Sequence, residues 1–106
     1  MELIINWTPL ARKKLRTIYR YYKKKANKIT AEKIVNGIVD ESIRLTHSPN
    51  IGQLELLLTE RKEVYRYLVY SNYKIIYWIK KDTNSIEISN VFDTRQNPNK
   101  IVEIKN

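Results

Sequence analysis

Two hydrophobic patterns divide the chain into a helix-forming first half and a strand-forming second half. From Val64 to Ile79, apolar and polar side chains largely alternate at a spacing of two, which is typical of half-buried strands. The pattern is interrupted at residues 70–72, so the segment predicts two strands and a connecting turn. A third strand runs into the sequence DTRQNP at residues 93–98, and the apolar run from Leu3 to Trp7 predicts a short strand at the start.

The first half has the periodicity of two amphipathic helices. Thr8 is a favourable N-cap and Pro9 suits the first helical position, so we expect a helix to begin there. Residues 27–30 form a connection, and Thr30 is the expected N-cap of a second helix. The apolar stripes comprise Ala11, Leu15, Ile18, Tyr19, Tyr22 and Ala26 in the first helix, and Ala31, Ile34, Val35, Ile38, Val39, Ser42 and Leu45 in the second. We expect an antiparallel hairpin in which Gly37 permits close packing against the first helix.

The register of the strand hairpin decides which side chains face the helices, because a shift of one residue reverses both faces. A two-residue turn at Ser71 and Asn72 would place Arg66 and Lys74 on opposite faces, and Ser-Asn is a poor type I′ pair. We favour a three-residue turn that pairs Val69 with Tyr73. That register puts Tyr65, Tyr67, Val69, Tyr73, Ile75, Tyr77 and Ile79 under the helices, and Arg66, Leu68, Lys74, Ile76 and Trp78 on the other face.

These elements predict an α+β fold with a helical hairpin packed on one face of a small, mainly antiparallel sheet. The length of 106 residues fits a single domain over residues 1–106, and we find no repeats and no linker rich in Gly or Ser. The segment from Leu54 to Arg61 is compatible with a short helix or with irregular structure. The tail after Pro98 can add a short element or stay loose.

Composition excludes several functional classes. The chain has no cysteine and a single histidine, His47, which argues against disulfides and against thiolate or histidine-cluster metal sites. With two glycines, a glycine-rich phosphate loop is excluded, so we expect no metal and no cofactor. The apolar run from Ile75 to Ile79 is far shorter than the ~20 residues that cross a bilayer. Because no secretory signal is recognisable, we expect a cytoplasmic protein without a membrane partner.

Positive charge is concentrated in the first helix. Twenty Lys and Arg residues against eleven Asp and Glu residues give a net charge of +9, and no acid lies between Arg12 and Lys28. Such clustering favours encounter with a polyanion, either nucleic acid or an acidic protein. The candidate steering residues are Arg12, Lys13, Arg16, Arg20, Lys23 and Lys24. A merely solvated helix face is the alternative.

Several short motifs occur together in a characteristic order: WTPLA at residues 7–11, Tyr-Arg at 65–66, NYKIIY at 72–77 and VFDTRQNP at 91–98. In order and spacing they resemble the ParE/RelE superfamily of bacterial toxins, which includes plasmid-stabilisation proteins, over residues 4–100. The resemblance implies a RelE/ParE-like fold and a type II toxin-antitoxin module. It leaves two activities open, because ParE-like members poison DNA gyrase and RelE-like members cut messenger RNA on the ribosome.

The resemblance also allows the cleaving site to be compared residue by residue. Arg66 stands where the RNA-cleaving toxins carry a strand lysine, Lys74 stands where they carry an arginine, and Arg95 matches their arginine after the last strand. Leu68, however, occupies the next position on the face of Arg66, and no Tyr or His follows Arg95. Metal-free RNA cleavage needs a proton acceptor and charge stabilisation, so the ParE-like branch is favoured. The three cations also have structural explanations: Arg66 can bond strand-end carbonyls, Lys74 can be solvated, and Arg95 can pair with Asp93.

We therefore expect a ParE-like toxin that inhibits DNA gyrase and forms a hetero-oligomer with a small acidic antitoxin. Whether the chain is an enzyme stays open; the enzymatic alternative is a metal-independent, ribosome-dependent mRNA endonuclease, with the ribosome and mRNA as partners. A third alternative is a non-toxic nucleic-acid-binding module. We expect Leu68, Ile76 and Trp78 to form an exposed apolar patch rimmed by charge, which is typical of a protein-binding surface and makes them candidates for antitoxin binding.

Overall fold

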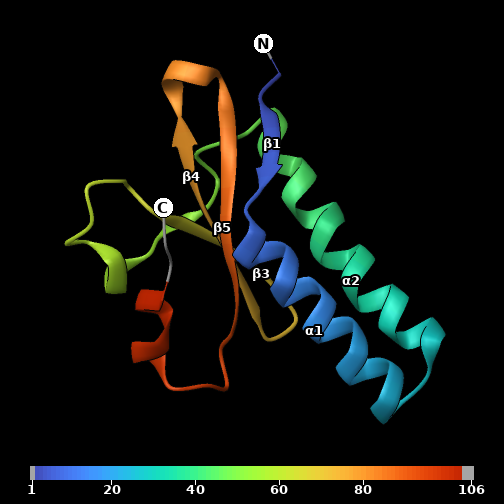
Figure 1. Cartoon of the computed structure of the whole chain (residues 1–106). Coiled ribbons are helices and arrows are strands. Elements are labelled where there is room, and N and C mark those ends of the chain that lie inside the picture. The colour runs from blue at the N-terminus through green and yellow to red at the C-terminus, as the bar shows by residue number, and fades with distance from the viewer. Residues whose placement is uncertain (1, 104–106) are drawn as a thin grey trace.

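In the computed structural model, which describes residues 2–103, five strands form one sheet in the order β1-β5-β4-β3-β2. Neighbouring strands are antiparallel except for β1 and β5, which are parallel. The strands are β1 (Ile4–Trp7), β2 (Gln53–Leu54), β3 (Arg66–Tyr70), β4 (Tyr73–Lys80) and β5 (Ser85–Asp93). Both helices lie against one face of this sheet (Figure 1), which confirms the predicted α+β architecture.

The helical hairpin consists of α1 (Pro9–Lys25) and α2 (Lys28–Ile43). Thr8 caps α1 as predicted: its hydroxyl accepts a hydrogen bond from Ala11 N and donates one to Ile88 O, which joins the start of the helix to β5. The predicted N-cap of α2 is wrong. Asn27, not Thr30, caps the helix, since its side-chain oxygen accepts from Thr30 N at 2.8 Å. Within residues 2–103, no helix is long and apolar enough to span a bilayer.

The main core lies between the helices and the sheet. Periodicity correctly predicted that both helices contribute to it, because their buried residues belong to the expected stripes. The buried members of this core are Ala11, Ile18, Ile38, Leu45, Leu68, Tyr73, Ile75, Tyr77, Ile86, Ile88 and Val91.

A second core covers the opposite face of the sheet. It is closed by two 3-10 turns, η2 (Leu56–Leu58) and η4 (Pro98–Glu103), which appear in yellow-green and red away from the helices in Figure 1. Two further 3-10 turns, η1 (Arg44–Thr46) and η3 (Lys81–Thr83), follow α2 and β4. The buried residues of the second core are Leu58, Tyr65, Ile76, Phe92 and Ile101. The ambiguous segment and the tail as far as residue 103 therefore both cover this face of the sheet, and the rest of the tail, residues 104–106, lies outside the described residues.

The favoured hairpin register is wrong. Tyr70 pairs directly with Tyr73, so the turn has two residues, and Ser71 adopts a left-handed backbone with a φ of 54°. Leu68 consequently lies opposite Ile75 and is buried under the helices, whereas Val69 is exposed. The error arose because the prediction assumed one core. With two cores, aromatic residues on either face can be buried, and turn chemistry alone did not decide the register.

Two glycines allow close approaches to tyrosines of the sheet. At Gly52, a Cβ atom would lie 2.5 Å from the Tyr77 hydroxyl and 2.9 Å from Tyr67 O, so a side chain there would displace backbone. At Gly37, a Cβ atom would meet the ring of Tyr70. The expectation that Gly37 packs against the first helix is therefore wrong, because this glycine makes room for a strand side chain.

Candidate functional site

The structure does not bring the three predicted functional cations together. Arg66 lies opposite Tyr77 on the helix-covered face and donates a hydrogen bond from Nη1 to Gly52 O at 2.9 Å. Lys74 lies on the other face, where its ammonium group is 2.8 Å from Glu55 Oε2 and 4.3 Å from the ring centre of Tyr67. The prediction that Arg66 and Lys74 share an open face is therefore wrong. Both side chains have structural partners, and they do not form a joint phosphate site.

The predicted apolar patch is not an exposed surface. Leu68 is buried in the main core and Ile76 is fully buried in the second core. Trp78 is partly exposed, packs against the second core and donates from its indole nitrogen to Glu87 Oε2 at 2.8 Å. The expectation failed because the turns η2 and η4 had no periodic pattern that would reveal that they cover this face.

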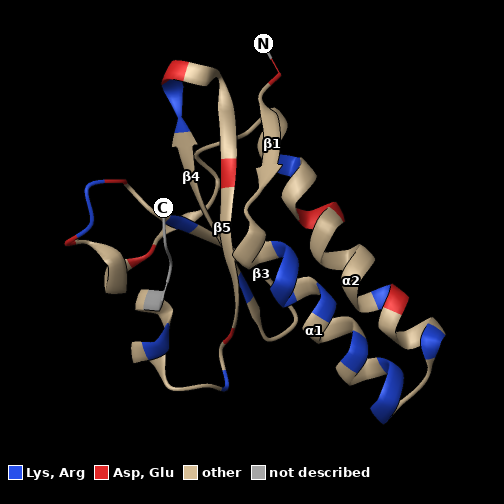
Figure 2. Cartoon of the chain, viewed as in Figure 1, with Lys and Arg blue, Asp and Glu red and all other residues tan. Residues whose placement is uncertain are grey.

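The basic face of α1 is present as predicted. Every side chain of the steering set is exposed, and Figure 2 shows blue positions along α1 without any red. By contrast, α2 carries both signs of charge, with Lys28 paired to Glu32 and Arg44 after its end paired to Glu41. The three lysines in the last turn of α1 also lie at the negative end of the helix dipole, where cations are favourable.

A cavity of about 600 Å³ lies between α1 and the end of β5. Cations line both of its walls: Lys13 and Lys14 come from α1, and Arg95 and Lys100 come from the segment after β5. Asp93 is the single acid among its described lining residues. The excess of positive charge attracts anions to the cavity.

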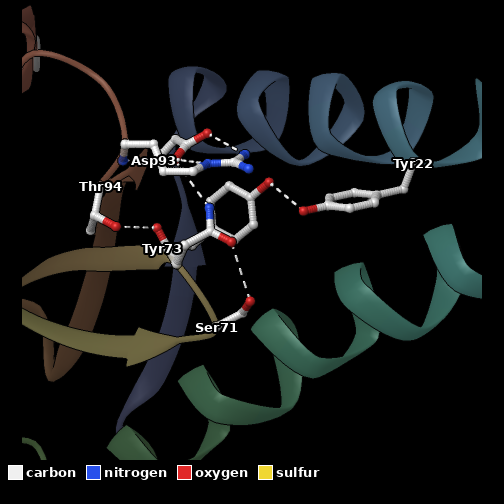
Figure 3. Close-up of polar contacts among 7 residues, drawn as sticks. Tyr22, Ser71, Tyr73, Asp93 and Thr94 are labelled. Carbon is white, nitrogen blue, oxygen red and sulfur yellow. Dashed lines mark hydrogen bonds and ion pairs between the residues drawn. The ribbon is translucent and has the colours of Figure 1, made fainter. Parts of the chain in front are cut away.

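The Asp93 side chain organises the wall of this cavity at the exit from β5 (Figure 3). Its Oδ1 atom accepts hydrogen bonds from Asn72 Nδ2, Arg95 N and Arg95 Nε at 2.9–3.0 Å, and its Oδ2 atom accepts from Arg95 Nη2 at 2.8 Å. These donors hold the pKa of Asp93 below its usual value, with the Arg95 side chain as the largest cause. The carboxylate in turn raises the pKa of Arg95. The suggested pairing of Arg95 with Asp93 is thus confirmed.

Tyr73 connects the hairpin turn to α1. Its ring is buried, and its hydroxyl donates to the Tyr22 hydroxyl at 3.4 Å, the contact that crosses to the helix in Figure 3. Burial, followed by the hydrogen bond with Tyr22, raises the pKa of Tyr73. Thr94 completes the connection, because its hydroxyl and its N–H group both donate to Asn72 O at 2.8 Å.

Sequence reasoning missed this cavity as a unit. It identified Arg95 and Lys13 separately, but it did not place Lys14, Tyr21 and Lys100 beside them. The order Asp-Thr-Arg at residues 93–95 was the available signal, since an acid two residues before an arginine can hold its guanidinium at a turn. The partner wall from α1 could not be found without knowing that α1 packs beside β5.

A model of the family described as "ParE toxin of type II toxin-antitoxin system, parDE" matches residues 5–98. The chain belongs to this toxin family. No curated protein matches it. Among solved structures, a chain described as "Chromosomal ParDE TA system from P. aeruginosa" has a TM-score of 0.71 and 22% sequence identity, and the match covers 87% of this chain and 96% of that chain. This similarity confirms the ParE-type fold, to which the sequence motifs had pointed.

Proposed function

We propose that the chain is the toxin of a type II toxin-antitoxin module, that it inhibits DNA gyrase, and that a small acidic antitoxin neutralises it. Membership in the ParE toxin family is the observation that carries this proposal. The separation of Arg66 and Lys74 onto opposite faces, together with the burial of Leu68, supports the choice of gyrase over messenger RNA. A cleaving site needs its charge-stabilising groups to converge on one phosphate.

The antitoxin would dock on the basic face of α1. Three features support this assignment: the face is exposed, it has no acid of its own, and it carries the densest positive charge of the chain. An acidic partner would be attracted along this face, and complementary charges accelerate association and select against wrong partners. The burial of Leu68 and Ile76 removes two of the three residues that were expected to form an apolar docking patch on the sheet, and the third, Trp78, is partly exposed.

The activity is tested by two assays run side by side. Expression without antitoxin should give filamentous cells with DNA-damage signalling, and the purified protein should block supercoiling by gyrase. Toeprinting of translating ribosomes should show no new cuts. Rapid codon-specific cuts with normal supercoiling would replace the proposal by the ribonuclease, and inactivity in both assays would favour the binding module.

Antitoxin docking is tested with two triple variants that lose the same charge. Arg16→Gln, Arg20→Gln and Lys24→Gln remove charge from α1, whereas Lys33→Gln, Lys62→Gln and Lys81→Gln remove it from exposed positions elsewhere. With the antitoxin encoded beside the gene, we expect the α1 variant to associate at least ~10-fold more slowly, because steering acts mainly on the association rate. Equal losses in both variants would contradict docking on α1.

A further inference from the structure

The cavity between α1 and the end of β5 has both polar and apolar lining. Lys13, Thr17 and Tyr21 follow one another at four-residue steps and form a single stripe on α1 that faces the cavity. Leu10, Ile18 and Val91 contribute apolar surface. The volume of about 600 Å³ lies within the range of ~300–1,000 Å³ that is common for small-molecule sites.

The charged groups of the cavity are arranged to receive a phosphate. Four cations line it against one carboxylate, and that carboxylate already accepts four hydrogen bonds from Asn72 and Arg95. The Asp93 contacts use Nε and one Nη2 proton of Arg95, whereas a guanidinium has five N–H donors. Asp93 therefore holds Arg95 in place while donors remain for a ligand. Lys13 comes from α1 and Lys100 from the segment after β5, so a bound anion would be contacted from both walls of the cavity.

Two aromatic side chains line the cavity, Tyr21 from α1 and Tyr73 from β4, and Tyr21 is the accessible one. Tyr21 is 46% exposed, whereas Tyr73 is 3% exposed. The Tyr21 ring stands at 88° to the ring of Tyr22, with 5.1 Å between the ring centres, and Tyr22 is in turn bonded to Tyr73. The edge contact with Tyr22, which packs against the main core, therefore fixes the orientation of the Tyr21 ring. An oriented, accessible ring beside cations is the arrangement on which nucleic-acid bases stack.

We propose that this cavity binds a nucleoside phosphate, presented either by a free nucleotide or by one unit of a single-stranded nucleic acid. Lys13, Arg95 and Lys100 contact the phosphate, and Tyr21 stacks on the base. This site adjoins the exposed α1 face that is proposed for the antitoxin and shares Lys13 with it, and nucleotide binding goes beyond the inhibition of gyrase. An acidic peptide would use the cations but would gain little from the ring, so the two ligand classes can be separated.

The test uses the full-length protein and fluorescence anisotropy with fluorescein-labelled (dT)8 and (rU)8, together with calorimetric titration of AMP and ATP. Inorganic phosphate and a poly-glutamate peptide serve as comparison ligands. The cavity variant Lys13→Gln/Lys100→Gln is matched by Lys24→Gln/Lys33→Gln, which loses the same charge outside the cavity. Tyr21→Ala is matched by Tyr21→Phe, which keeps the ring.

We expect the cavity pair to weaken nucleotide binding by ~10-fold or more, since two phosphate contacts are lost, and the matched pair by less than ~3-fold. Tyr21→Ala should weaken binding by at least ~5-fold, and Tyr21→Phe should change it little, as stacking requires only the ring. Saturation by AMP alone would identify free nucleotide as the source, and binding of the oligomers alone would identify a strand.

Three results would overturn the proposal. Equal losses in the cavity and matched pairs would show diffuse attraction to a basic surface. Binding of poly-glutamate with the same strength and the same dependence on Tyr21 would show an anion site without nucleotide selectivity. Absence of binding by wild type would exclude the site. Because a variant can also fail to fold, amide chemical-shift mapping on the wild type provides an independent readout: Thr17, Tyr21 and Gln96 should shift with AMP or the oligomers, and shifts confined to residues outside the cavity would contradict the assignment.

Discussion

The two faces of the sheet are covered in different ways. One face lies under two helices whose apolar residues recur at three- and four-residue steps, and the other lies under the 3-10 turns η2 and η4. Ile75 and Ile76 are neighbours in β4, both are completely buried, and each belongs to a different core. The helical cover can therefore be predicted from the spacing of its apolar residues, whereas the 3-10 turns bury side chains equally well without a recognisable spacing in the sequence.

The two covers also differ in polarity. Under the helices, the polar contacts include tyrosine hydroxyls such as that of Tyr77, which accepts from Gly52 N at 3.0 Å and donates to Pro49 O at 2.7 Å. On the other face, an ion pair fastens η2: Glu55 is 4% exposed, accepts from Leu57 N and pairs with Lys74. A short turn offers little apolar surface, and the charged pair fixes its position.

The largest effect is expected from truncating the two isoleucines. Ile75→Ala should lower the free energy of unfolding by about 4 kcal/mol and Ile76→Ala by about 2 kcal/mol, within the range for such cavities. The difference follows because short turns can move inward and fill a void more easily than a helical hairpin docked on the sheet. Urea denaturation of both variants measures it. An equal or larger loss for Ile76→Ala would show that the turns form a cover as rigid as the helices.

Breaking the ion pair should have the next largest effect. Lys74→Met leaves the Glu55 carboxylate buried without its partner, which should cost about 2 kcal/mol, less than for a fully buried pair because Lys74 retains some access to water. The double variant Glu55→Gln/Lys74→Met should recover part of this loss. Thermal unfolding of these variants and of the exposed control Lys81→Met measures the effect. If Lys74→Met is as stable as the control, the pair does not hold η2 in place.

A smaller effect is expected from removing one hydroxyl on each side of the sheet. Tyr77→Phe leaves Gly52 N and Pro49 O without their partner in a buried place, at a cost of about 1–2 kcal/mol. Tyr67→Phe removes an exposed hydrogen bond to Gln53 and should cost less. Hydrogen exchange provides the local readout, since the Gly52 amide should lose protection in Tyr77→Phe only. Similar exchange in both variants would contradict a locking role for Tyr77.

The smallest effect concerns pH and the Asp93–Arg95 pair. Because the pKa of Asp93 is lowered in the folded state, the ionised carboxylate adds stability above its unfolded value of about 3.9, and this contribution is lost as pH falls through the lower folded pKa. The melting temperature of Asp93→Asn should therefore lie below that of wild type at pH 7, and the gap should close toward pH 3. A gap that stays constant between pH 7 and pH 3 would show that the pair does not contribute through its charge.

The comparison of the two faces also explains which parts of the fold could be predicted. Thr8, Pro9 and the two helical stripes act locally, so α1, most of α2 and the helix-on-sheet arrangement were predicted correctly. The hairpin register depended on whether Leu68 or Tyr67 lies under the helices, and residues far along the chain decide that question: Leu58 and Ile101 supply the second core. Local patterns carry no information about such distant partners.

The candidate site shows the same division. Arg95 and its partner Asp93 could be predicted because they are two residues apart in a turn. The burial of Ile76 and the capture of Lys74 by Glu55 could not, because the segment that covers them has neither a helical nor a strand period. The cavity likewise joins α1 to the chain after β5, and only the packing of these two elements places Lys13 near Arg95.

The parallel pairing of β1 with β5 has a consequence for biosynthesis. Ile4 lies opposite Ser85, and the hydroxyl of Thr8, the N-cap of α1, donates a hydrogen bond to Ile88 O. β1 can therefore pair only after β5, the last strand to be synthesised, has left the ribosome. The helical hairpin involves near neighbours and can form early, but a chain that ends before β5 has no partner for β1 and cannot close the main core. Prematurely terminated chains would then lack the folded surface of the toxin, and only chains that include β5 would acquire it.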